Sequence, residues 1–123
     1  MGVSTDGILF WGISFDPETD EDLPPWLDEG AYDVYDEWER RCSAFKDVQF
    51  GSHGSDGYSM WYVTIDGLSC TAPRGYPQDV TTVADEALGI GRNDEVYERL
   101  RTFVELNDLP WSEPKLLLSS YWG

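Results

Sequence analysis

Hydrophobic side chains recur along the chain in patterns that predict both strands and helices. Residues 7–15 carry apolar side chains on both faces, which is typical of a strand in the interior of a sheet. Residues 58–66 alternate with a period of two, and residues 47–50 form a shorter run of the same kind. The glycine- and serine-rich residues 51–57 predict a turn-rich connection, so that these two strands would form a hairpin.

Three helices are predicted by apolar residues at spacings of three and four. The first follows two adjacent prolines and would bury one face made of Leu27, Ala31, Val34, Tyr35, Trp38, Cys42 and Phe45. The second covers residues 80–88 and is closed by Gly89, and the third has Asn93 as its N-cap and stops at Asn107. Residues 115–122 predict a last strand.

These elements follow one another in the order β-α-β-β-α-α-β. The chain has 123 residues, a length that suits one domain, and 41% of them are hydrophobic, which is enough for a core and argues against a disordered acidic segment. We therefore expect residues 1–123 to form a single α+β domain, with about three helices packed on a mainly antiparallel sheet.

Negative charge is concentrated at one end of the chain. Asp16–Glu39 holds eleven carboxylates and no Lys or Arg, and residues 1–39 carry a formal charge of −12 out of a total of −16. Phosphate groups would repel such a chain, so the charge argues against direct binding to nucleic acid or to an anionic membrane. Basic proteins, including nucleic-acid-binding complexes of a host cell, are the favoured partners.

Two interpretations of the acidic stretch remain open. Most charge runs are solvated faces that need no partner. Alternatively, the stretch imitates nucleic-acid phosphate and occupies a basic surface, with Trp26 as an aromatic contact among the carboxylates. On this second interpretation the partner-binding residues are Asp20, Glu21, Asp22, Trp26, Glu29, Asp33, Asp36 and Glu37.

Several short segments resemble a group of small acidic bacteriophage proteins of unknown function. The opening at residues 2–12, GVSTDGILFWG, and the close at residues 119–123, SSYWG, carry most of the resemblance. Residues 51–53, 62–63 and 74–77 add to it, while the acidic stretch differs most. The resemblance implies a phage origin, and it brings no activity or cofactor with it. Small acidic phage proteins include inhibitors of host defence such as anti-CRISPR and DNA-mimic proteins, which is an analogy by class.

His53, the single histidine, offers the alternative of an enzyme or a small-ligand-binding protein. It would act as a general base, with Ser52 or Ser55 as nucleophile and Asp56 orienting it. Residues so close in sequence seldom reach that geometry, because their side chains diverge. We therefore expect no enzyme activity and no catalytic residue.

No cofactor or metal site is expected either. The chain has no P-loop, and Gly89-Ile90-Gly91 is more simply a helix end followed by a turn. The alternating carboxylates of residues 16–22 lack the central glycine and the final glutamate of an EF-hand loop. The two cysteines, together with an N-terminus unlike a secretory signal, favour the reducing cytoplasm of the host cell.

Overall fold

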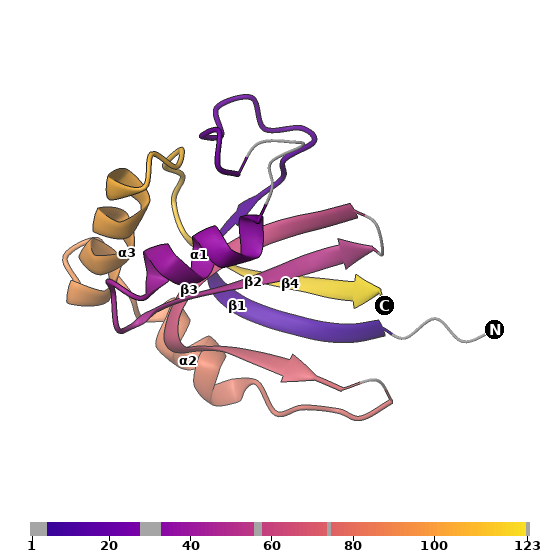
Figure 1. Ribbon diagram of the computed structural model, residues 1–123. Coiled ribbons are helices and arrows are strands. Elements are labelled where there is room, and N and C mark those ends of the chain that lie inside the picture. The colour runs from indigo at the N-terminus through magenta and orange to yellow at the C-terminus, as the bar shows by residue number, and fades with distance from the viewer. Residues whose placement is uncertain (1–4, 28–32, 56–57, 74, 123) are drawn as a thin grey trace.

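The computed structural model describes residues 5–27, 33–55, 58–73 and 75–122, and it confirms an α+β fold with the predicted order of elements. Figure 1 shows the helices arranged around a curled sheet, with α1 across the strands and α3 at one end of them. The elements are β1 (Thr5–Phe15), α1 (Val34–Cys42), β2 (Val48–Ser55), β3 (Tyr58–Ala72), α2 (Thr81–Leu88), α3 (Glu95–Leu106) and β4 (Lys115–Trp122).

The four strands lie in the order β4-β1-β3-β2, and each neighbouring pair is antiparallel. β1 is therefore an interior strand, as its apolar residues on both faces predicted. β2 and β3 form the predicted hairpin. The sheet curls so strongly that its two outer strands meet, through a single parallel bridge between Gly54 and Tyr121.

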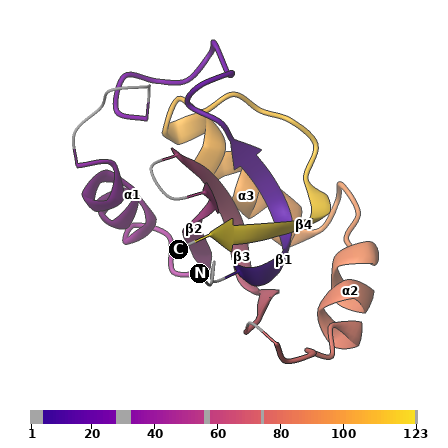
Figure 2. The same cartoon turned by 90° about the vertical axis from the view of Figure 1, so that its right-hand side faces the viewer.

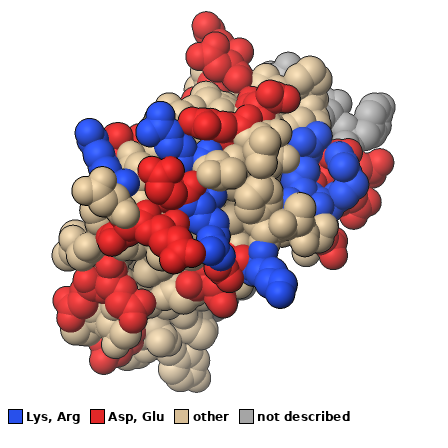
Figure 3. All heavy atoms as spheres, turned by 90° about the vertical axis from the view of Figure 1, so that its left-hand side faces the viewer, with Lys and Arg blue, Asp and Glu red and all other residues tan. Residues whose placement is uncertain are grey.

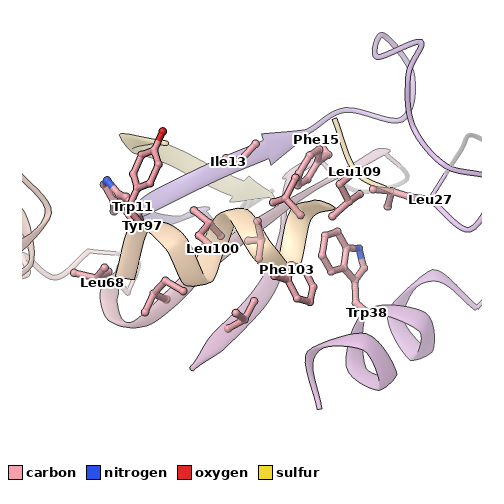
Figure 4. Packing of buried hydrophobic residues seen from close by; sticks show 14 of the residues in the cluster. Trp11, Ile13, Phe15, Leu27, Trp38, Leu68, Tyr97, Leu100, Phe103 and Leu109 are labelled. Atoms are coloured by element: carbon pink, nitrogen blue, oxygen red, sulfur yellow. The ribbon is translucent and has the colours of Figure 1, made fainter. Parts of the chain in front are cut away.

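One face of the sheet packs against the helices and forms the main hydrophobic core. Figure 2 shows α1 and α2 on opposite sides of the sheet with α3 behind it. Trp38 of α1 is completely buried and contacts the rings of Phe15 and Phe103, as well as three further aromatic side chains. Figure 4 shows these rings converging between β1, α1 and α3. Other members of this core are Trp11, Ile13, Leu27, Val63, Ile65, Leu100, Val104 and Leu109.

The opposite, inner face of the sheet encloses a smaller interior. Phe10 is completely buried there and stacks on Tyr62, with ring centroids 4.2 Å apart. The Tyr62 ring lies directly over Gly51, where a Cβ atom would meet the phenol oxygen at 2.4 Å. His53 lies next to both rings, at 6.2 Å from Phe10 and 6.0 Å from Tyr62.

β1 contains a bulge between Phe10, on the inner face, and Gly12. The register with β3 shifts between Phe10 and Gly12, and a Cβ atom on Gly12 would lie 1.9 Å from the carbonyl oxygen of Val63. Only glycine permits this close approach. The buried Thr64 hydroxyl donates a hydrogen bond to the carbonyl of Trp11 at 2.7 Å, so the carbonyl freed by the bulge is paired.

The first helix is shorter than the sequence predicted. It begins at Val34, because Asp33 before it adopts a left-handed conformation with φ of 55°. Leu27 is buried ahead of the helix, where its N–H closes a turn onto the carbonyl of Pro24. Tyr35 is 60% exposed, so its predicted place on the buried face is wrong, although its ring edge contacts Phe50.

Three strands are longer than predicted, β1 by two residues at its start, and one helix cap differs. β2 extends to Ser55 through most of the predicted connection, and β3 continues to Ala72. The glycines of these segments favour turns, and this preference was the stronger signal in the sequence. In the folded protein, backbone pairing along both strands outweighs it. The N-cap of α3 is Asp94 rather than Asn93, while Gly89 caps α2 as predicted.

Both cysteines are free thiols. Burial raises the pKa of Cys42 to about 12, so this thiol stays protonated at neutral pH. Among the helices that the described ranges contain, none has the length and apolar composition needed to cross a bilayer.

Candidate functional site

The acidic loop, which we define as residues 16–22, leaves the end of β1 and is held by its own carboxylates. The Asp16 N–H donates to Oδ2 of Asp20 at 2.9 Å, and the Glu18 N–H donates to Oδ1 of Asp16 at 3.0 Å. Carboxylates that accept backbone N–H groups in this way fix a turn locally. The loop is therefore ordered by its acids, although they repel one another.

A hollow of about 450 Å³ lies beneath this loop, and we call it the acidic hollow. Three predicted partner-binding residues, Asp20, Glu21 and Asp22, line one side of it, and Trp111 lines another. A second hollow of about 470 Å³, which we call the Lys115 hollow, adjoins it. The residues that line both hollows are Ile13, Ser14 and Ser112.

Four carboxylates of the loop differ in their ion pairing from Glu37 of α1, which is paired with two arginines. Within the part of the chain that the structure describes, Glu18, Asp20, Glu21 and Asp22 form no ion pair with Lys or Arg. Figure 3 shows Lys and Arg interleaved with acids over the middle of one face, whereas the projection at its top, where Figure 1 has the acidic loop, carries carboxylates alone. The negative charge of these four side chains is thus not offset by an ion pair with Lys or Arg in the described residues.

The acids of α1 divide into exposed and paired ones. Asp33 and Asp36 are exposed, as predicted. Glu37 instead accepts hydrogen bonds from Arg40 at 2.7 Å and from Arg41 at 3.1 Å, and the bond to Arg40 is the main cause that lowers its pKa. Its charge is therefore largely compensated. Glu29, the remaining predicted acid, lies outside the described residues.

Trp26 is half-buried and is engaged within the molecule. Its ring edge packs on Trp38 with centroids 5.0 Å apart, and its indole N–H donates to the carbonyl of Asn107 at 3.2 Å. The guanidinium of Arg41 lies over the Trp26 ring at 4.4 Å and also donates to the Asn107 side chain. These contacts tie the segment before α1 to the end of α3.

His53 joins three strands inside the curled sheet. Its Nε2 lies 2.9 Å from the Ser14 hydroxyl on β1, and its Nδ1 lies 2.7 Å from the Ser119 hydroxyl on β4. The residue is only 5% exposed, and burial lowers its pKa, although the charge of Asp16 opposes this shift. At neutral pH the ring is therefore uncharged, with one nitrogen donating and the other accepting.

The sequence interpretation placed His53 in a loop and chose the wrong partners. No bond joins Ser52 to His53 among the described residues, because both lie on the same strand, where neighbouring side chains diverge, and the Ser55 side chain lies outside the described residues. Asp56 lies outside the described residues. The serines that do bond to His53 are 39 and 66 positions away, and their pairing depends on sheet curvature, which no local pattern reveals.

Metal ligands do not converge in the described ranges: no group of three or more His, Cys, Asp or Glu side chains is placed to hold an ion. Searches against protein-family models, curated proteins and solved structures return no match.

Proposed function

We propose that this chain is a phage-borne, acidic interaction protein that inhibits a host defence complex, in the manner of an anti-CRISPR protein. Its acidic end occupies a basic surface on which the complex otherwise binds nucleic acid, in the cytoplasm of the host cell. The phage origin comes from the resemblance of the two ends of the chain to small acidic phage proteins. The mode of action comes from the distribution of charge.

The observation that carries this proposal is the uncompensated group of carboxylates around the acidic hollow. Glu18, Glu21 and Asp22 are exposed and form no ion pair with Lys or Arg in the described ranges. Asp36 extends the same charge onto α1. Such a surface attracts a basic partner over about 8 Å at physiological ionic strength and raises the rate of encounter.

The loop is also suited to imitate phosphate because it is held in one shape. Asp20 accepts a hydrogen bond from the backbone of Asp16, which limits the entropy that is lost when a partner orders the loop. Trp111 at the edge of the hollow adds apolar contact area for a partner, while its ring is packed within the molecule against Tyr97 and under the Arg101 guanidinium. A basic, Arg-rich protein surface fits these features better than a neutral one.

The test is co-purification of the host complex with a tagged protein and with a charge-reversed variant. The variant is Glu21→Lys/Asp22→Lys/Asp36→Lys, which leaves Asp20 in place because it holds the loop. A matched control, Asp85→Lys/Glu86→Lys/Glu98→Lys, makes the same change in net charge at exposed positions of α2 and α3. We expect the first variant to lose binding and the control to retain most of it.

Equal binding by wild type and both variants would show the acidic loop to be a solvated face. Equal loss in both variants would show that net charge, rather than the loop, governs association. Binding of wild type that does not weaken as salt rises would also contradict the proposal, since interactions between exposed charges are screened by salt.

A further inference from the structure

We propose that Ser14 and His53 form a catalytic dyad that transfers the acyl group of a cationic ester or amide onto the Ser14 hydroxyl. This activity goes beyond the proposed inhibitory function and does not depend on it. It is drawn from the His53 cluster and from the two hollows that Ser14 lines.

The geometry is that of an activated serine. The Ser14 hydroxyl and His53 Nε2 are 2.9 Å apart, within the 2.6–3.2 Å expected for a nucleophile and its general base. Ser119 supplies the third group, which orients the base: its hydroxyl lies 2.7 Å from Nδ1 and accepts from that nitrogen in the tautomer that leaves Nε2 free to accept a proton. All three side chains come from different strands, so the sheet itself holds them in register.

A substrate reaches Ser14 from outside the curled sheet. Ser14 is half-buried, and it forms part of the wall of both the acidic hollow and the Lys115 hollow. His53 is only 5% exposed, and its Nε2 lies beside the Ser14 hydroxyl, where the leaving group and then the attacking water would meet it. Ser112 lines both hollows and Lys115 lines one, and their O–H and N–H groups are available to the negative charge that develops on the substrate oxygen.

The reaction proceeds in two balanced steps. The Ser14 oxygen bonds to the carbonyl carbon, His53 Nε2 takes the serine proton, and that proton then passes to the leaving alcohol or amine as its bond to the carbonyl carbon breaks. In the second step His53 removes a proton from water as the water oxygen bonds to the acyl carbon. The bond between that carbon and the Ser14 oxygen then breaks, His53 returns the proton to the Ser14 oxygen, and the acid is released. The charge of Asp16 stabilises the imidazolium that forms in both steps.

The substrate class follows from the charge of the acidic hollow. Asp20, Glu21 and Asp22 line it without an ion pair to Lys or Arg in the described residues. They favour a cationic group on the substrate and disfavour an anionic one. An ester or amide of a basic amino acid or of a guanidino acid meets this requirement.

The first experiment treats the full-length protein with a fluorophosphonate probe at pH 8 and locates the adduct by mass spectrometry. Attack by Ser14 forms an O–P bond and releases fluoride, so the modified residue is identified directly in wild-type protein. We expect one adduct, on Ser14. An adduct on another serine, or none, would overturn the proposal whether or not the Ser14 variants fold.

The second experiment compares hydrolysis of p-nitrophenyl 4-guanidinobenzoate, a cationic ester, with that of an anionic p-nitrophenyl ester. Ser14→Ala should abolish acylation, and His53→Gln should slow it by about 10²–10⁴-fold. Ser69→Ala, on β3 and outside both hollows, is the control that should react like wild type. Asp20→Asn/Asp22→Asn should reduce the preference for the cationic ester about tenfold while Ser14 remains acylated.

Two results distinguish a catalytic dyad from a merely structural cluster. Acylation should slow as the pH falls and His53 becomes protonated, which a structural hydrogen bond would not cause in folded protein. Ser14→Cys should restore a covalent adduct through sulfur. A flat pH profile, or equal acylation of wild type and His53→Gln, would refute the dyad, and neither outcome bears on binding of the host complex.

Discussion

The two faces of the sheet differ in how their buried side chains are held. On the helix-covered face, Trp38 is enclosed by aromatic and aliphatic side chains, and its indole N–H has no hydrogen-bond partner in the described residues. On the inner face, His53 is almost as well buried, but both of its ring nitrogens are paired with serine hydroxyls. The first face depends on packing, and the second depends on hydrogen bonds between strands.

The two faces therefore contribute differently to the stability and to the shape of the sheet. Apolar burial is the main source of folding free energy, so the helix-covered face supplies most of the stability. The inner face is small, and its polar cluster links β2 to β4, which otherwise share one backbone bridge. The hydrogen bonds of the His53 cluster therefore contribute more to the closed shape of the sheet than to the overall stability of the protein.

The largest effect is expected on the helix-covered face. Trp38→Ala removes a completely buried side chain that contacts five rings, and it should lower the free energy of unfolding by about 3–5 kcal/mol. Urea denaturation followed by circular dichroism measures the change. Trp38→Phe should cost clearly less, because it keeps an aromatic ring and removes the unpaired N–H. Equal losses in the two variants would mean that ring packing is not what stabilises this face.

The inner face should respond more weakly to an equivalent truncation. His53→Ala leaves the hydroxyls of Ser14 and Ser119 without their partner, and we expect a loss of about 1–3 kcal/mol in urea denaturation. Gln49→Ala, at an exposed position of the same strand, is the matched control and should change stability by about 0.5 kcal/mol or less. A loss for His53→Ala as small as that of the control would show that the cluster does not support the closed sheet.

Only the inner face should make stability sensitive to mild acid. Burial lowers the pKa of His53 in the folded state below its usual 6.5, so at lower pH the unfolded chain binds a proton that the folded one excludes. Wild type should therefore lose stability relative to His53→Gln between about pH 7 and pH 5.5. The pKa values of Glu37 and Asp79 are lowered from their ordinary values of 4.5 and 3.8. These two carboxyls therefore stay ionised throughout this pH window. Identical pH dependence in both proteins would contradict the role assigned to burial.

The smallest effects are expected from surface charge. Glu37→Lys places a cation beside Arg40 and Arg41 and should lower the melting temperature slightly. Asp36→Lys, one residue away and without an ion pair in the described ranges, should leave it unchanged or raise it, because repulsion among the acids is relieved. Thermal melts at low and high salt measure both, and a difference that persists in high salt would rule out an electrostatic cause.

The order of elements could be predicted because each one has its own periodic signal. β4 was predicted with its exact bounds, and β1 was recognised as an interior strand from its two apolar faces. The ends of α1 and β2 were not, because a left-handed Asp33 and a glycine-rich strand are decided by tertiary contacts rather than by local preference.

The candidate site was predicted in part for a similar reason. A run of carboxylates is visible in sequence, and three of its members, Asp20, Glu21 and Asp22, line the acidic hollow. Pairing of Glu37 with two arginines was less apparent, although its i+3 and i+4 spacing was a signal that could have revealed it. The Ser14 and Ser119 partners of His53 could not be found, because curling of the sheet alone brings them together.

The ring of Tyr62 over Gly51 constrains how this protein can evolve. Any side chain at position 51 would collide with the tyrosine ring, which cannot move easily because it stacks on the buried Phe10. Replacement of Gly51 is therefore tolerable only when a smaller residue replaces Tyr62. In divergent descendants of this chain the two positions should change together, and a glycine opposite an aromatic residue would mark a sheet that has kept the same curvature.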